Sequence, residues 1–428
     1  MGIDLAWSPR NPSGYAALCP DGQVLEASSS PAGDDEVLGL IERLLPGDQP
    51  GIVAIDAPLA VPNESGGRQC DQEVASVFAR FQAAPYPANR KNLSRYGGLR
   101  AEAIRRRLEA SGYRHSPIVE PRADARQVIE VFPHPATVSL FGLDITLKYK
   151  ARQGRTYPLR WRELDRLRDG LYSLRLARPP LHMPPDLMAL QIEGTRGREL
   201  KHLEDLLDAI VCAYSALYAW YHGPRGYAAY GRGALVDEPE AAHILVPMTP
   251  GGWQRIRGDR LLFLDRDGTL NRSLGDRPPN EPSEVELLPG VWRRLHHRAS
   301  LGWRLVIITN QGGVAFGYRT HRQAWSTHQA VLDALPVEVE ANYLCPHHPE
   351  GTDPVYATTC PQRKPGPGAI LDALARFGSR PGDCLFVGDH DTDRQAAEAA
   401  GVPFAWAWEF FATDPPAHGV EDGRRPTG

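Results

Sequence analysis

The sequence predicts an α/β protein of two domains, the first with a mixed β-sheet and the second with a parallel β-sheet. The chain has 428 residues, and at about 100–200 residues per domain this length favours two domains. A strand that runs into an aspartate occurs twice, at Asp4 and again at Asp265. Several strands open the first half before any helix, whereas strands and helices alternate in the second half, which is typical of parallel sheets. We therefore predict domains over residues 1–245, including a Gly-, Pro- and Tyr-rich linker, and 246–411, followed by a disordered tail over 412–428.

The composition is that of a folded protein in a reducing compartment. Hydrophobic residues make up 42% and charged residues 23% of the chain, and no run of about 18 apolar residues exists for a membrane span. The first residues lack the basic and apolar regions of a secretory signal, and six cysteines are too few for a disulfide framework. Because 48 basic and 52 acidic residues leave a net charge of −4, we expect no global attraction to nucleic acid or membrane, although a local basic groove is compatible with it. We therefore expect a cytoplasmic protein, and the sequence leaves its oligomeric state open.

The first half opens with three strands, one helix and a fourth strand. The first strand ends near Trp7, the second covers residues 14–19, and an Asp-Gly hairpin signal separates it from the third. A helix begins at Asp34, and its apolar residues follow the 3.6-residue period. The next strand is of the buried type and ends at Asp56. Three antiparallel strands, a crossover helix and a strand beside the first form the opening of an RNase H-like fold.

This strand order places acidic side chains together. Asp4 and Asp56 end neighbouring strands, and a helix over about residues 200–221 carries Asp205 and Asp208 on one face. Clustered acids of this kind bind two metal ions about 3.5–4 Å apart and cut phosphodiesters. Such acids are also common as helix caps or solvent-facing groups, and the same core fold serves nucleotide-binding proteins. The candidate site therefore consists of Asp4, Asp56 and either Asp205 or Asp208.

Two further features of the first half are candidates for binding. Another strand ends near Glu130, and both Glu130 and Arg68 are candidate site residues. Basic residues interleaved with Tyr86 and Tyr96 form either a phosphate-binding surface or a solvated helix face. These basic residues are Arg90, Lys91, Arg95, Arg105, Arg106 and Arg107.

Segments of the first half resemble a predicted RNase H-like nuclease family of unknown function. The resemblance covers about residues 1–222 and rests on the segments GIDLAWSP, AIDAPLAVP, RQCD, EVFPHP, KYK and HLEDLLDAIVCAY. It implies the RNase H-like fold, together with a metal-dependent nuclease activity that is itself only a prediction for that family. The alternative is a non-catalytic binding or oligomerisation module.

Polar residues end three predicted strands of the second half. These strands end at Asp265, at residues 309–311 and at Asp389, and helices are predicted over residues 290–301 and 367–377. Sheets of this type bind their ligands at the carboxyl ends of the strands. We therefore expect the functional site of the second domain at this edge.

The segment LDRDGTLN is the most specific motif in the chain. Two carboxylates two residues apart at a strand end, followed by Gly and a hydroxyl, resemble the first motif of the haloacid dehalogenase (HAD) superfamily. The other motifs follow in order, as Thr309, then Lys364, then Asp389 with Asp393. Lys364 is the only lysine after residue 201 in an arginine-rich chain, which favours a specific role over a surface charge. Asp393 either lies behind the metal ligands or caps the following helix.

The HAD resemblance implies a role for each motif residue. Asp265 attacks phosphorus and forms an aspartyl-phosphate, and Asp267 acts as general acid and then as general base. Thr309 and Lys364 hold the phosphoryl oxygens. Asp265, the main-chain carbonyl of Asp267 and Asp389 bind Mg²⁺, which takes oxygen ligands and offsets the charge of the phosphate.

Within this superfamily, the second half resembles the histidinol-phosphatase and heptose-bisphosphate phosphatase branch over about residues 259–411. The segments NQGGVAFGYRT, CPHHPEG and CPQRKPGPG carry the resemblance. The branch has a zinc loop of four Cys and His ligands, of which Cys345, His347 and Cys360 are present. Gln362 stands at the fourth position, so either zinc has been lost or water or another side chain completes the site. His348 is the nearest substitute.

The resemblance also bears on the substrate. Arg363 matches the substrate-contacting arginine of the branch, and Asn310 is a second expected substrate contact. The implied substrate is a small phosphorylated metabolite such as a heptose bisphosphate or histidinol phosphate. The alternative is a nucleic-acid 3′-phosphate end, because the same branch is similar to nucleic-acid 3′-phosphatases and a nuclease-like domain precedes it.

Overall fold

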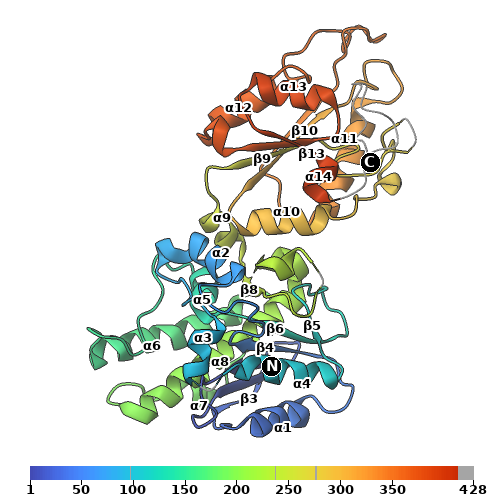
Figure 1. The fold of residues 1–428 in the computed structure, drawn as a ribbon. Coiled ribbons are helices and arrows are strands. Elements are labelled where there is room, and N and C mark those ends of the chain that lie inside the picture. The colour runs from blue at the N-terminus through green and yellow to red at the C-terminus, as the bar shows by residue number, and fades with distance from the viewer. Residues whose placement is uncertain (97, 237, 275–276, 413–428) are drawn as a thin grey trace. The chain divides into compact units, whose positions relative to one another are not determined.

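The computed structural model describes residues 1–428 apart from 97, 237, 275–276 and 413–428. The chain divides into two compact units, Met1–Ile256 and Arg257–Gly428 (Figure 1). The predicted tail lies outside the described residues from 413 onward. None of the helices in the described part of the chain combines the length and the hydropathy that crossing a bilayer requires.

The first unit extends further than the predicted boundary between residues 245 and 246. Strand β8 (Ile244–Pro247) spans that point and pairs antiparallel with β7 (Tyr227–Tyr230), and helix α9 (Pro250–Ile256) follows. All residues of both strands are buried. The Gly-, Pro- and Tyr-rich stretch is therefore part of a packed unit rather than a linker, because its two short strands pair with each other.

The main sheet of the first unit has six strands in the order β3-β2-β1-β4-β6-β5. The neighbours β1, β2 and β3 are antiparallel, whereas β4, β6 and β5 continue from β1 in parallel. This arrangement confirms the predicted RNase H-like mixed sheet. The strands are β1 (Gly2–Asp4), β2 (Gly14–Leu18), β3 (Val24–Ser29), β4 (Gly51–Asp56), β5 (Arg114–His115) and β6 (Arg126–Glu130).

Helices cover both faces of this sheet. On one face, Ile3 of β1 packs with Ile41 of α1 and Ile104 of α4. On the other, the 26-residue helix α8 contacts β1, β2 and β4. The helices are α1 (Asp34–Leu44), α2 (Gln69–Phe78), α3 (Arg90–Leu93), α4 (Arg100–Ala110), α5 (Pro133–Phe141), α6 (Tyr157–Ser173), α7 (Pro185–Met188) and α8 (Gly197–His222).

Two glycines let helix α8 lie directly on the sheet. A Cβ atom on Gly2 would overlap the backbone of Ala213, and one on Gly14 would overlap the backbone of Asp205. Because neither strand carries a side chain at these points, the helix backbone approaches the strands closely. This approach brings the acids of α8 to the end of β1.

The second unit has a five-stranded parallel sheet in the order β11-β10-β9-β12-β13, as the alternating pattern predicts. Phe263, Ile308 and Phe386 from its central strands pack with Ile370 and Ala396 of the covering helices. The strands are β9 (Leu261–Leu264), β10 (Arg304–Asn310), β11 (Ala341–Cys345), β12 (Leu385–Gly388) and β13 (Phe404–Trp406). The helices are α10 (Val291–Ser300), α11 (His321–Ala334), α12 (Gly368–Phe377), α13 (Asp391–Ala399) and α14 (Ala407–Phe411).

A stacked pair of buried histidines predicts that the first unit is sensitive to acid. The rings of His115 and His243 lie 4.3 Å apart between centroids, and burial lowers the pKa of His115 to about 4. In the unfolded chain a histidine titrates near pH 6.5, so the unfolded state binds more protons than the folded state between about pH 6.5 and 4. We expect the urea midpoint of the full chain to fall as pH is lowered through this window, and to fall less in His115→Phe.

The exposed His182 supplies the control for this prediction. His182→Gln should keep the pH dependence of the wild-type urea midpoint. An identical pH dependence in His115→Phe and the wild type would contradict the assignment to the stacked pair.

Candidate functional site

Three aspartates meet at the carboxyl edge of the parallel sheet. Asp265 follows β9, Asp389 follows the neighbouring strand β12, and Asp393 lies in the first turn of α13. Their side chains offer oxygen atoms that all lie within 4.8 Å of one another. Gly268 has a φ of +85°, and a Cβ atom there would overlap the Asp389 carboxylate. The glycine of the LDRDGTLN motif therefore leaves the space in which Asp389 reaches the site.

Lys364 supplies the positive charge among these aspartates. Its Nζ contacts the Asp265 carboxylate and lies 2.6 Å from Oδ1 of Asp393. Burial raises the pKa of Asp265 well above its usual value, and burial and Asp393 raise the pKa of Asp389 to about 6. One ammonium group thus faces three crowded carboxyl groups. The oxygen donors and the uncompensated negative charge fit a Mg²⁺ ion, which prefers carboxylate ligands.

The side chain of Asn310 holds the main chain of Lys364. Its Nδ2 donates to the Lys364 carbonyl at 2.9 Å, and its Oδ1 accepts from the Lys364 main-chain N–H at 3.1 Å. Asn310, the predicted substrate contact, therefore fixes the backbone of the lysine through one donor and one acceptor of its amide. Arg363, the other predicted contact, is half-buried and donates to the carbonyl of His347 at 3.1 Å.

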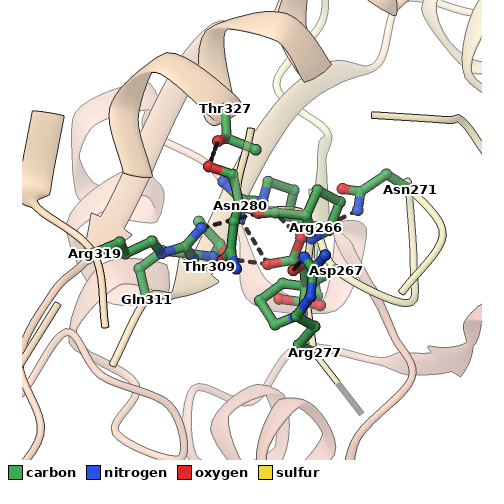
Figure 2. Close-up of polar contacts among 12 residues, drawn as sticks. Arg266, Asp267, Asn271, Arg277, Asn280, Thr309, Gln311, Arg319 and Thr327 are labelled. Atoms are coloured by element: carbon green, nitrogen blue, oxygen red, sulfur yellow. Dashed lines mark hydrogen bonds and ion pairs between the residues drawn. The ribbon is translucent and has the colours of Figure 1, made fainter. Parts of the chain in front are cut away.

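Asp267 is the centre of a polar network that sequence reasoning did not foresee (Figure 2). Gln311 donates from Nε2 to Asp267 at 2.8 Å and to the Thr309 hydroxyl at 2.7 Å, and its Oε1 accepts from Arg319. Arg266 donates to Asp267 at 2.8 Å. Burial would raise the pKa of Asp267, yet Arg266 and these hydrogen bonds lower it overall. The arginine between the two motif aspartates was the signal in the sequence that could have indicated this network.

Sulfur and imidazole ligands form a second group in this unit. Cys345 at the end of β11, His347 and Cys360 offer ligand atoms within 4.8 Å of one another, and burial raises the pKa of Cys345 to about 11. Gln362 is exposed. His348 does not substitute for it among the described contacts, because its Nδ1 accepts from the N–H of Glu350 at 3.1 Å. The three predicted zinc ligands are thus together without a fourth Cys or His in the described group.

The predicted acids of the first unit converge around a lysine. Asp4 and Asp56 are directly paired in register, and Lys150 lies 3.4 Å from Asp4 and contacts Asp208. Tyr149 donates to Asp208 at 2.6 Å. Burial and Asp4 raise the pKa of Asp56, whereas in Asp4 the effect of burial is outweighed by Lys150, so the pKa of Asp4 is lowered.

This arrangement differs from the expected two-metal site. Among the residues that the structure describes, the groups of three or more ligands that could hold a metal ion both lie in the second unit. In the first unit, the ammonium group of Lys150 lies between Asp4 and Asp208 instead. Asp205 is held by Lys201, and burial and Asp4 raise the pKa of Asp205 to about 7. The described residues therefore do not fit a preformed pair of divalent ions.

Arg68 and Glu130 form a buried brace rather than an open site. Arg68 lies 2.6 Å from Glu130 and 2.7 Å from Asp71, and all three side chains are almost completely buried. Glu130 also accepts from the N–H of Leu59 at 2.9 Å. These two candidate site residues connect the start of α2 to the end of β6. Because the charges of Arg68 and Glu130 pair with each other inside the protein, they do not face a ligand.

Much of the predicted basic surface is neutralised. Arg105 is fully buried and pairs with Glu109, Arg106 pairs with Glu102, and Arg107 pairs with Asp35. Arg90 likewise lies 3.6 Å from Glu102. Because carboxylates face these arginines, the helix α4 surface carries far less positive charge than its sequence suggests.

Named relatives of the second unit are phosphatases. D-glycero-beta-D-manno-heptose-1,7-bisphosphate 7-phosphatase of Rhodopseudomonas palustris is 35% identical over 144 residues, which cover 33% of this chain and 79% of that protein. The protein of the same name from Escherichia coli is 36% identical over 149 residues, covering 33% and 74%. A solved structure of D,D-heptose 1,7-bisphosphate phosphatase from B. bronchiseptica, complexed with magnesium and phosphate, has 31% identity, covers 34% of this chain and 78% of that chain, and has a TM-score of 0.31.

The site of the second unit consists of an aspartate after a central strand of a parallel sheet, a lysine that faces it, and two aspartates from the neighbouring strand and helix. This arrangement defines a HAD-type hydrolase. In this chain the hydrolase unit follows an RNase H-like unit. Residues 2–230 match the family described as "Protein of unknown function (DUF429)", and residues 362–407 match the description "HAD-hydrolase-like". The chain belongs to the DUF429 family through its first unit and to the HAD-family phosphatases through its second.

Proposed function

We propose that the second unit is a Mg²⁺-dependent phosphomonoesterase that works through an aspartyl-phosphate on Asp265. The observation that carries this proposal is the convergence of Asp265, Asp389 and Asp393 with Lys364 at the end of the sheet. A Mg²⁺ ion held by Asp265, Asp389 and the main-chain carbonyl of Asp267 would offset the negative charge of the phosphoryl oxygens. The ammonium group of Lys364 adds a second positive charge to the same point.

The residues of this site account for both halves of the reaction. A carboxylate oxygen of Asp265 attacks phosphorus, the bond from phosphorus to the leaving oxygen breaks, and the Asp267 carboxyl gives that oxygen a proton. The Asp267 carboxylate then takes a proton from water as the water oxygen attacks phosphorus, and the bond to Asp265 breaks to release phosphate. The donors from Arg266 and Gln311 stabilise ionised Asp267, which is the form needed in the second half.

We propose a small phosphorylated metabolite as the substrate, with the sugar phosphate heptose 1,7-bisphosphate as the first candidate and histidinol phosphate as the second. The support is the relatives of the second unit, which are named heptose-bisphosphate phosphatases at 35–36% identity. A nuclease role for the first unit is not part of this proposal, because Lys150 lies among the acids that would hold the ions.

Phosphate release in the presence of Mg²⁺ tests the proposal. Heptose 1,7-bisphosphate, histidinol phosphate and a 3′-phosphorylated oligonucleotide are compared, with Asp265→Asn as the blank. The highest kcat/KM for heptose 1,7-bisphosphate or for histidinol phosphate supports the proposed substrate class. Preference for the oligonucleotide would instead make the protein a nucleic-acid end-processing enzyme, and equal release by Asp265→Asn would contradict the mechanism.

We also propose that Cys345, His347 and Cys360 bind zinc as three ligands with water at the fourth position. Structural zinc sites usually have four protein ligands, so a three-ligand site should lose its ion more readily. Gln362→Cys is expected to retain zinc at a chelator concentration that strips the wild-type protein, as measured by the metal content after dialysis. Gln362→Ser, which adds no thiolate, is the control, and equal zinc loss from Gln362→Cys and the wild type would refute the three-ligand site.

A further inference from the structure

A group of exposed or half-buried basic side chains lies next to the acid cluster of the first unit. The segment between α5 and α6 contributes Lys148, Arg152 and Arg155, and a distant loop contributes Tyr86. The Arg152 guanidinium lies 5.5 Å from the centroid of the Tyr86 ring and donates to its hydroxyl. Tyr86 is 74% exposed. We name these four residues the basic rim.

Two cations of the basic rim, Arg152 and Arg155, form no ion pair with a carboxylate in the described part of the chain, whereas Lys148 interacts electrostatically with the Glu163 carboxylate. No ion pair joins Lys148, Arg152 or Arg155 to an acid among the described residues, although Glu163 accepts from the main-chain N–H of Lys148. Burial and the neighbouring arginines lower the pKa of Lys148, and burial and Arg152 lower the pKa of Arg155. The cations therefore repel one another, and a bound anion would relieve that repulsion.

The arginines of helix α4 differ from those of the basic rim in their carboxylate partners. The sequence left open whether the α4 arginines form a phosphate-binding surface or a solvated helix face, and Arg105, Arg106 and Arg107 each pair with a carboxylate. On the short segment between α5 and α6, by contrast, Arg152 and Arg155 form no ion pair with a carboxylate among the described residues. Positive charge of this kind, beside an exposed aromatic ring, is the combination that binds single-stranded nucleic acid.

The basic rim is also joined to the acid cluster. Arg155 donates to the main-chain carbonyl of Lys150 at 3.0 Å, and the Lys150 ammonium contacts Asp4 and Asp208. A nucleic-acid strand bound to the rim would therefore pass beside these acids.

We propose that the basic rim binds the phosphates of a single-stranded nucleic acid, with one base stacked on Tyr86. The cations are spread along the segment from residue 148 to residue 155 and so fit several phosphates better than one. The inference concerns the first unit and does not depend on the phosphatase proposal. Three cations predict a slope of about −2 for the logarithm of the binding constant against the logarithm of salt concentration, at about −0.7 per phosphate contact.

Fluorescence anisotropy of the full chain with a labelled oligothymidylate, at a series of KCl concentrations, tests this proposal. The double variant Lys148→Gln, Arg152→Gln is expected to weaken binding and to reduce the salt slope by about 1.4. Tyr86→Leu is expected to weaken binding about fivefold or more, whereas Tyr86→Phe retains it. All of these side chains are at least partly exposed, so the urea midpoints should stay at the wild-type value.

Helix α4 supplies the matched control. The double variant Arg106→Gln, Arg107→Gln removes the same charge from paired side chains and should leave the affinity unchanged. An equal loss in this control, no loss in the rim variant, or no binding by the wild type would overturn the proposal. Inorganic polyphosphate, which carries phosphates without bases, tests whether the rim recognises nucleic acid or phosphate alone. Equal affinity for polyphosphate and the oligothymidylate, together with no effect of Tyr86→Leu, would overturn the assignment to nucleic acid.

Discussion

Asp265→Asn is expected to lower phosphate release from the preferred substrate by at least about 10³-fold. The amide has almost the shape of the carboxylate but cannot form the bond to phosphorus that the mechanism requires. Burial and the neighbouring Asp389 and Asp393 raise the pKa of Asp265, so its charge is unfavourable in the folded state. The urea midpoint at pH 7 should therefore be unchanged or higher, because the variant removes a buried like charge.

Another aspartate of the second unit serves as the control for this prediction. Asp383 is exposed and lies before β12, and Asp383→Asn should retain wild-type kcat/KM. Both variants are assayed in the same preparation series, with phosphate release and the urea midpoint as readouts. Turnover by Asp265→Asn within tenfold of the wild type would rule out Asp265 as the nucleophile.

Arg68→Met is expected to lower the free energy of unfolding by about 3–5 kcal/mol. Arg68 lies 2.7 Å from Asp71 and 2.6 Å from Glu130, and these three side chains are buried. Removing the guanidinium leaves two carboxylates in the interior without a positive partner. The resulting loss in the free energy of unfolding is larger than the loss on breaking an exposed ion pair. Urea unfolding of the full chain, followed by circular dichroism, measures the change.

Two further variants separate charge imbalance from lost packing. Adding Asp71→Asn and Glu130→Gln to Arg68→Met removes the unpaired charges and should restore much of the lost stability. Arg107→Met breaks the exposed pair with Asp35 and should cost no more than about 1 kcal/mol. A loss for Arg68→Met as small as that for Arg107→Met would show that the brace contributes little.

Much of the architecture could be predicted because it depends on local patterns. The period of the apolar residues places the strands and helices, and the order of the elements then limits the sheet to few arrangements. Asp4 and Asp56 meet because neighbouring parallel strands end at one edge, and Asp265 and Asp389 meet for the same reason. Residues at strand ends can therefore be placed together before any side chain is seen.

The partners of these residues depended on packing between distant segments. Lys150 lies 146 positions from Asp4, and Arg68 lies 62 positions from Glu130, so no spacing in the sequence indicates either pair. Within α4 the pairs of Arg105 with Glu109 and of Arg106 with Glu102 have helical i,i+4 spacing, whereas Arg107 pairs with Asp35, which comes from α1.

The motifs and the periodicity thus sufficed for the two α/β units, for the order of the first four strands of the mixed sheet and for the acids at the strand ends. The three-dimensional packing was needed to tell a carboxylate group that suits a cation, at Asp265, from one that already contains an ammonium group, at Asp208. The reason is physical. The charge that an acid or a base presents to a ligand is what remains after its neighbours in space have been counted, and those neighbours come together only when the chain folds.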